Sequence, residues 1–444
     1  MRSVLVSGLW SIGLLIGCGH PPAARAPAAL PLQPTALHYT GQSYVLLRHG
    51  QPYFIQGAGY QTDGPNRMAR LRACGGNSIR IWDETEAEPV LAQAQGQGLT
   101  VLFGLWVERE TDGFDYDDQI AVDKQFERLR KIVLKYRHHP ALLMWCVGNE
   151  VVLFATNLRA YDEVSRLIAM IHQLDPDHPV TTALSMDSAR TVWLLRERCP
   201  GLDVLSVNVY GDIARMHRFL KEGGWTGPYL ISEFGAKGYW PGDAQMTPWN
   251  TPIEPTSQQK REFVRLNYEQ YIGSRPANGL GAYLFFWGNK QEETHTWFSF
   301  FDEQNRETPL VGLMQSLWSK RVPDNQAPVV AQVFADGRAT TSVTFNASSA
   351  IHQAQVVATD PDGDSLSYAW EIRASASRTQ LSAYQDVPMP ILDGLIDVAD
   401  AAQVRFRLPP RPGAYRLFVT IYDTHRHVAT ANLSFRVASV DALP

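Results

Sequence analysis

The chain has 444 residues, of which 45% are hydrophobic and 19% are charged, and its formal net charge is −5. This composition is sufficient to bury a large core and a second, smaller domain, which excludes a disordered chain. The small net charge and the lack of any basic block exclude the surface that nucleic-acid binding requires, so we expect a neutral partner and no nucleic acid.

The N-terminus has the pattern of an export signal. Arg2 supplies a positive start, and the apolar stretch from Val4 to Gly17 is too short to span a membrane stably. Leu15-Ile16-Gly17-Cys18 resembles the lipobox of bacterial lipoproteins, which implies that Cys18 becomes the lipid-bearing first residue of the mature chain. We therefore expect residues 1–18 to be a lipoprotein signal peptide and residues 19–38, rich in Pro and Ala, to be an extended tether. An ordinary signal peptide cut elsewhere is the alternative.

The same resemblance implies an exported lipoprotein of the cell envelope, held at the outer membrane or the cell surface through Cys18. Apart from this anchor we expect a monomer. Three cysteines remain, Cys74, Cys146 and Cys199. An odd number, scattered through predicted helices and strands, indicates neither a disulfide framework nor a zinc site. We expect buried free thiols.

Eight short apolar runs alternate with longer segments of helical period from Tyr53 to Trp318. The runs cover residues 53–60, 78–83, 100–107, 142–150, 179–185, 204–211, 229–235 and 281–288. Strands that alternate with helices predict βαβ units and a parallel sheet, and eight such units close a barrel. We therefore predict an α/β fold, a (β/α)8 TIM barrel, over residues 39–322.

The predicted strands end in polar and aromatic residues. Barrel enzymes place their chemistry at the C-terminal ends of the strands, so these residues are candidates for the site. A purely structural barrel has no reason to collect ionisable groups there, because unpaired buried charges are costly. The strand ends carry Arg80, Asp83, Glu108, Asn149, Glu150, Asn208, Tyr210, Glu233, Trp287 and Asn289.

Two of these residues are glutamates on opposite sides of the predicted barrel mouth. Glu150 ends the fourth run and Glu233 ends the seventh. Cleavage of a glycosidic bond with retention requires two carboxyl groups roughly 5 Å apart, one protonated to assist the leaving oxygen and one ionised to attack the anomeric carbon. We predict Glu150 and Glu233 as this catalytic pair.

The residues around both glutamates resemble a known family. Met144-Trp145-Cys146-Val147-Gly148-Asn149-Glu150 resembles the acid/base motif of the clan A barrel glycosidases, especially the catalytic domain of glycoside hydrolase family 2. Ile231-Ser232-Glu233-Phe234-Gly235 resembles the nucleophile motif of the same group, and the stretch from Gly75 to Arg80 matches its second strand. The resemblance covers roughly residues 45–320 and implies a retaining β-glycosidase that hydrolyses an oligo- or polysaccharide by double displacement.

The resemblance also implies roles for neighbouring residues. Asn149 would bind the sugar hydroxyl next to the reacting carbon, Tyr210 would orient the nucleophile, and Arg80 matches the arginine of the second strand. A structural ion pair of Arg80 with Asp83 or Glu84, and a plain buried Tyr210, are the alternatives. Further substrate-binding candidates are Asn208, Trp82, Trp106 and Trp287.

Trp287 is our candidate for the floor on which the sugar stacks, and a position inside the barrel is the alternative. No cofactor is expected for catalysis. Sugar and linkage specificity do not follow from these motifs. A transglycosylase with the same two glutamates, and a non-catalytic surface protein that binds glycans, are the competing functions.

The pattern changes after a turn-rich linker at residues 323–329. Short alternating strands predict a small all-β sandwich over residues 330–444. Asp360-Pro361-Asp362-Gly363-Asp364 resembles the turn of Ig-, PKD- and cadherin-like modules. Asp360, Asp362 and Asp364 offer the hard oxygen ligands that calcium prefers. A turn with solvated carboxylates is the alternative to a calcium site.

Overall fold

The computed structural model describes residues 34–61, 67–375, 388–397 and 401–438. The predicted signal peptide, the lipobox with Cys18 and most of the predicted tether therefore lie outside the described residues. No helix within the described ranges is both long and apolar enough to cross a membrane.

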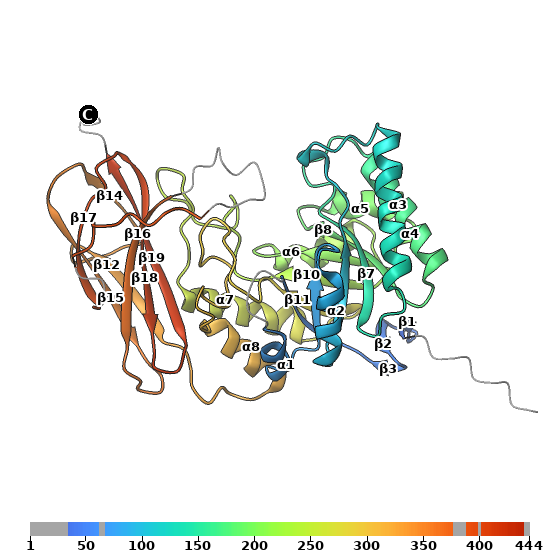
Figure 1. The fold of residues 1–444 in the computed structure, drawn as a ribbon, viewed down its shortest axis with the longest axis horizontal. Helices are drawn as coiled ribbons and strands as arrows, with labels where there is room; N and C mark the ends of the chain where they lie inside the picture. Colours follow the sequence, from blue (N-terminus) through green and yellow to red (C-terminus); the bar gives the residue numbers. More distant parts are fainter. Residues whose placement is uncertain (1–33, 62–66, 376–387, 398–400, 439–444) are drawn as a thin grey trace, which may run out of the picture. The chain divides into compact units, whose positions relative to one another are not determined.

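Eight parallel strands close into a barrel in the order β10-β11-β4-β5-β6-β7-β8-β9 (Figure 1). Every predicted run overlaps one of them, and the predicted TIM barrel is confirmed. The strands are β4 (Ile55–Gly59), β5 (Ser78–Ile81), β6 (Thr100–Leu105), β7 (Leu142–Asn149), β8 (Val180–Ser185), β9 (Val204–Asn208), β10 (Tyr229–Phe234) and β11 (Gly279–Leu284).

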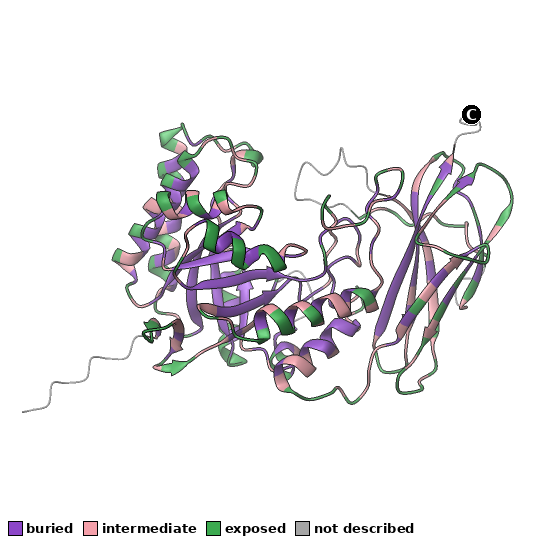
Figure 2. Cartoon of the chain, turned by 180° about the vertical axis from the view of Figure 1, so that it is seen from behind, coloured by how far each residue is buried: buried purple, intermediate pink, exposed green. Residues whose placement is uncertain are grey.

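A helix follows each barrel strand along the chain. The helices are α1 (Met68–Ala73), α2 (Ala87–Gly96), α3 (Gln119–Tyr136), α4 (Arg159–Leu174), α5 (Ala189–Arg198), α6 (Ile213–Glu222), α7 (Ser257–Tyr268) and α8 (Pro309–Ser319). Two short helical segments add to them, η1 (Glu110–Asp112) and η2 (Glu269–Gly273). Figure 2 shows the barrel strands buried and the outer faces of the helices exposed. This pattern explains the unbroken apolar runs, because both faces of a parallel strand are covered.

A small antiparallel sheet precedes the barrel and corrects our domain boundary. It consists of β1 (Thr35–Tyr39), β2 (Tyr44–Arg48) and β3 (Gln51–Pro52). Residues 35–38, which we assigned to the tether, pair with residues 45–48 instead. Arg48 donates to the Leu142 carbonyl at the start of β7, at 2.8 Å, so this sheet is fastened at the N-terminal end of the barrel.

The C-terminal region is a sandwich of two four-stranded sheets, ordered β13-β12-β15-β17 and β14-β19-β18-β16. The all-β prediction for this region is confirmed. One apolar cluster fills the space between the sheets. The strands are β12 (Val329–Ala335), β13 (Arg338–Ala339), β14 (Ser342–Asn346), β15 (Ile351–Thr359), β16 (Ser367–Ala374), β17 (Gln403–Arg407), β18 (Gly413–Tyr422) and β19 (Val428–Ala438).

Buried charges join the sandwich to the barrel loops. Arg416 of β18 donates to Glu293 at 2.9 Å, and both side chains are only 2% exposed. Lys260 of α7 forms a second buried ion pair with Glu254 at 2.5 Å, within the barrel part of the chain. The three remaining cysteines are buried and free, as predicted.

Candidate active site

Glu233 lies at the C-terminal end of β10 and receives three hydrogen bonds. Arg80 donates to its Oε1 at 2.9 Å, and the Trp82 indole donates to the same oxygen at 2.8 Å. The Tyr210 hydroxyl donates to Oε2 at 2.8 Å. The residue is only 7% exposed. This set of donors matches an ionised carboxylate, which can only accept.

Arg80 of β5 holds several strand ends together from inside the barrel. Its Nη2 donates to Asn149 Oδ1 at 2.6 Å, and its Nη1 also donates to the Ser232 carbonyl at 2.8 Å. Its ion-pair partner is Glu233, not Asp83 or Glu84. Glu84 pairs with Arg128 instead. A side chain that is 1% exposed and carries a full charge is stable only because these acceptors surround it.

Glu150 follows β7 directly and has an unusual backbone conformation. Its φ is +52°, and its N–H donates to the Ala183 carbonyl of the neighbouring strand at 2.9 Å. A residue other than glycine in this region stores strain of order 1–3 kcal/mol, and such residues cluster at functional sites. The backbone bond to Ala183 holds this conformation, and the side chain accepts from Asn208 at the end of β9.

Asn208 connects the two glutamates. Its Nδ2 donates to Glu150 Oε1 at 2.9 Å, and its Oδ1 accepts from Arg80 at 3.3 Å. Arg80 in turn donates to Glu233. Both carboxyl groups therefore belong to one polar network at the same end of the barrel, as predicted from their positions at the ends of the fourth and seventh barrel strands.

Two ionisable groups near Glu233, Glu150 and Tyr210, have raised pKa values. The Glu150 side chain is half-buried, and this burial raises its pKa to about 7, with the nearby charge of Glu233 acting in the same direction. Burial also raises the pKa of Tyr210 well above its usual value, again with help from Glu233. At neutral pH the phenol therefore stays protonated and remains a donor, while Glu150 is poised between its acid and base forms.

A Glu150 pKa of about 7 predicts that the activity falls on the alkaline side of the pH profile. Because the general acid must carry a proton, we expect kcat/KM for a glycoside with a poor leaving group to fall about tenfold per pH unit above about pH 7. The control is Glu150→Gln assayed with a dinitrophenyl glycoside, whose leaving group needs no proton. Its profile should lack this fall, and a fall that persists would assign the titration to another group.

Trp287 is not the stacking floor that we predicted. It is 1% exposed, and its indole donates to the Arg67 carbonyl at 3.2 Å. Its ring packs against Phe300, Phe301 and Trp318 in the core. The apolar run continues past the end of β11 at Leu284, and the chain has already left the strand before Trp287. The alternative, a buried structural tryptophan, is what the structure shows.

Phe285, rather than Trp287, packs against the two aromatic residues that donate to Glu233. It follows β11 directly, and its ring centroid lies 6.0 Å from that of Tyr210 and 5.8 Å from that of Trp82. It is 7% exposed. Phe285 and Trp287 lie two residues apart in the same apolar run, so the sequence marked both as candidates. It did not reveal that the strand ends at Leu284, directly before Phe285.

The two other tryptophans are half-buried and engage polar partners. The Trp82 indole serves as a donor to Glu233, a role that we did not predict, although its position two residues after Arg80 places both on one face of an extended run. The Trp106 indole donates to Glu108 at 3.1 Å, and the Arg109 guanidinium lies over its ring. Trp106 therefore belongs to the loop after β6, outside the network around Glu233.

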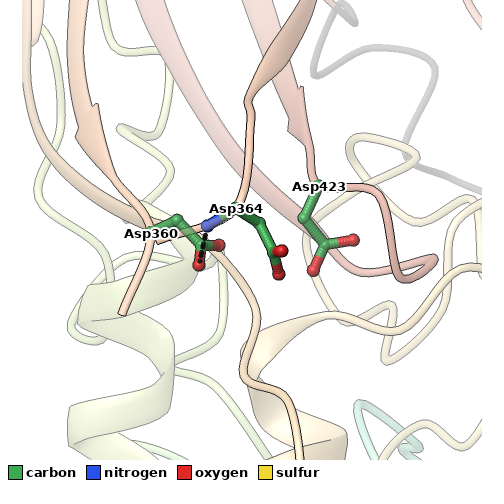
Figure 3. A group of neighbouring side chains, drawn as sticks. All are labelled: Asp360, Asp364 and Asp423. Carbon is green, nitrogen blue, oxygen red and sulfur yellow. Dashed lines mark hydrogen bonds between the residues drawn. The ribbon is translucent and has the colours of Figure 1, made fainter. Parts of the chain in front are cut away.

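The sandwich brings together a different set of aspartates from the one that we predicted as calcium ligands. Asp360, Asp364 and Asp423 offer oxygens that all lie within 4.8 Å of one another (Figure 3). Asp362 is not in this group, because its Oδ2 accepts from the Gln326 N–H at 2.7 Å. Asp423 comes from the turn after β18, far along the chain, and no local spacing pointed to it.

The fold and the site together define a barrel of the glycosidase type, with paired glutamates at the ends of its fourth and seventh strands. The family model of the glycosyl hydrolases family 2 TIM barrel domain matches residues 64–292, a little over half of the chain. The chain belongs to this family.

Known relatives share only part of their length with this chain. β-Glucuronidase from Felis catus is 25% identical over 181 residues, which cover 37% of this chain and 26% of that protein. The match to the Homo sapiens β-glucuronidase is 23% identical with the same coverage, so the chain spans about a quarter of these relatives. The solved Bacteroides uniformis β-glucuronidase has a TM-score of 0.51 at 13% identity, over 91% of this chain and 48% of that one, and shows the same fold.

Proposed function

We propose that this protein is a retaining β-glycosidase that hydrolyses glycosidic bonds in an oligo- or polysaccharide. The observation that carries the proposal is the contrast between the two carboxyl groups in one network. Glu233 accepts three hydrogen bonds, which suits an ionised nucleophile, and burial raises the pKa of Glu150 to about 7, which suits a general acid. Retention requires one carboxyl group of each kind.

The reaction then proceeds in two steps. Glu150 gives its proton to the leaving oxygen while a Glu233 oxygen attacks the anomeric carbon, so the glycosidic bond breaks and a glycosyl ester forms. The ester carries no charge, which removes the second of the two influences that raised the pKa of Glu150, the charge of Glu233. Glu150, now ionised, takes a proton from water as the water oxygen attacks the same carbon. The ester bond breaks, and Glu233 leaves as a carboxylate.

Asn149 is oriented to bind the sugar. Its Oδ1 accepts from Arg80 at 2.6 Å and from Asn208 at 3.0 Å. These bonds fix the amide so that its NH2 group points away from both donors, and no described residue accepts from it. That group is suited to donate to the hydroxyl next to the reacting carbon.

The test is a screen of aryl β-glycosides, including a β-glucuronide because the named relatives are β-glucuronidases. The anomer released first is then identified by NMR. A β-anomer as the first product supports double displacement, and an α-anomer contradicts it. Longer products at high oligosaccharide concentration would show that a sugar acceptor competes with water and would favour the transglycosylase.

We also propose that Asp360, Asp364 and Asp423 bind calcium. Their grouped oxygens supply the hard ligands that this ion prefers. Two buried oxygens beside the group, Asp360 Oδ2 and Asn325 Oδ1, have no hydrogen-bond partner in the described part of the chain. Asn325 reaches the group itself, since its Nδ2 lies 2.6 Å from Asp364 Oδ2.

Calcium should therefore stabilise the protein against unfolding. At about 100 times Kd, an ion that binds only the folded state adds about 3 kcal/mol. We expect a higher Tm with calcium than with EGTA, and no difference in Asp364→Asn. Asp362→Asn serves as the matched control and should keep the calcium effect. Equal Tm values for wild type in calcium and EGTA would contradict the site.

For the N-terminus we propose export and lipid attachment at Cys18, with the protein held at the cell envelope and otherwise monomeric. Support for the anchor comes from Leu15-Ile16-Gly17-Cys18 alone. A carbohydrate substrate and a lipid anchor together would describe an enzyme that acts at a membrane surface.

A further inference from the structure

The loop that follows the acid/base presents an aromatic ring to solvent. Phe154 is 84% exposed and has a φ of +59°, and it lies four residues after Glu150. A single exposed apolar side chain is ordinary by itself. Here, however, the ring stands on the loop that starts at Glu150 and has a strained backbone, and strain of this kind persists only where the surroundings impose it.

Hydrogen bonds fix this loop from both sides. The Leu153 N–H donates to the Glu150 carbonyl at 3.0 Å, which forms a tight turn directly after the acid/base. Glu110, from the loop after β6, accepts from the Thr156 N–H at 2.7 Å, the Thr156 hydroxyl at 2.6 Å and the Asn157 N–H at 2.8 Å. These bonds also lower the pKa of Glu110, so its carboxylate stays ionised at neutral pH. The two loops therefore behave as one unit.

A hollow of about 440 Å³ lies between the same two loops. Phe114 and Tyr116 line it, with their ring centroids 4.9 Å apart, and residues 156–158 form the opposite side. Asp115, Asp117 and Glu110 add carboxylates to the lining. The accessible lining is mostly polar, since Tyr116 is buried, and its hydrogen-bond acceptors suit the hydroxyl groups of a sugar.

We propose that these two loops form the leaving-group side of the site, an inference that rests on the proposed glycosidase function. Phe154 stacks on the sugar whose oxygen Glu150 protonates, and the hollow takes the next sugar along. Three carboxylates line the hollow among the described residues, and one of them, Asp117, is paired with Arg159 at 2.8 Å, so the net charge of the lining stays negative. The leaving portion is therefore a neutral or amino-sugar oligosaccharide, and a uronate in this position is disfavoured by like charge.

The test compares two substrates with the same reacting sugar, one with a dinitrophenyl leaving group and one with an oligosaccharide. Phe154→Ala should lower kcat/KM for the oligosaccharide about tenfold and change that for the dinitrophenyl glycoside less than about twofold. Phe154→Trp should keep the wild-type ratio. The matched control is Trp193→Ala, which removes a 45% exposed ring from α5 on the outside of the barrel and should leave both values unchanged.

The outcomes separate this inference from the function on which it rests. If wild type cleaves none of the glycosides, the proposed function fails. If wild type is active and Phe154→Ala changes both substrates equally, the leaving-group role of the loop is wrong while the function stands. A uronate in the leaving portion that is cleaved better than its neutral counterpart would overturn the assignment of the hollow.

Discussion

Glu233→Ala should lower kcat for every β-glycoside that wild type cleaves by on the order of 10⁴-fold or more. Without this carboxylate no glycosyl ester can form. The variant should fold, because Arg80, the charged donor to Glu233, keeps other acceptors. Arg80 still donates to Asn149 and to the Ser232 carbonyl. Stopped assays with the most reactive aryl glycoside from the screen measure the loss.

Azide distinguishes the loss of the nucleophile from a general loss of structure. In Glu233→Ala, azide should attack from the vacated face and give an α-glycosyl azide. In Glu150→Ala, azide should attack the glycosyl ester instead and give a β-glycosyl azide. Opposite products from the two variants would assign both roles, and identical products would refute the assignment.

A carboxylate outside the network provides the matched control for this loss. Glu108 also follows a barrel strand, but its side chain is 41% exposed and its Oε2 accepts from the Trp106 indole. We expect Glu108→Ala to change kcat less than about tenfold. A loss in Glu108→Ala as large as that in Glu233→Ala would show that the effect is not specific to the nucleophile.

The second large effect is a loss of stability, expected at the buried contact between the sandwich and the barrel loops. Arg416→Met should lower the free energy of unfolding by about 3–5 kcal/mol, because it removes the guanidinium that neutralises a carboxylate in a buried site. Arg416 donates to Glu293 at 2.9 Å and to the Pro252 carbonyl at 2.7 Å. Denaturant unfolding followed by fluorescence measures the change.

Two further variants test whether charge burial is the cause. In Arg416→Met combined with Glu293→Gln no buried charge is left without its partner, so the double variant should recover part of the stability. Arg407→Met removes an exposed arginine paired with Asp397 at 2.7 Å and should cost less than about 1 kcal/mol. A double variant less stable than the single one would contradict the electrostatic explanation.

The same buried contact connects the sandwich to the active site. The Arg416 guanidinium lies over the Trp297 ring, and the Trp297 indole donates to the Lys237 carbonyl at 2.8 Å, in the loop after Glu233. The next residue, Phe298, packs against Tyr210 with ring centroids 5.5 Å apart. The sandwich thus stabilises the loops that hold the hydroxyl donor to Glu233.

The sequence alone predicted the barrel and the two glutamates for a physical reason. Parallel strands covered on both faces read as apolar runs, and a closed ring of such strands brings all their C-terminal ends to one mouth. Glu150 and Glu233 could therefore be assigned to a common site from their positions in the fourth and seventh runs. Arg80 and Asn208 follow from the same rule, since both lie within or at the end of a predicted strand.

Only the tertiary structure decided what each side chain contacts. Trp287 and Phe285 occupy equivalent positions in one apolar run, and which of them reaches the site depends on where the last ladder hydrogen bond of β11 lies. The calcium group depends on Asp423, which comes from a different strand end than Asp360 and Asp364. Sequence periodicity records which face of an element is buried, but it carries no information on where the backbone turns once the ladder stops or on which distant segment meets it there.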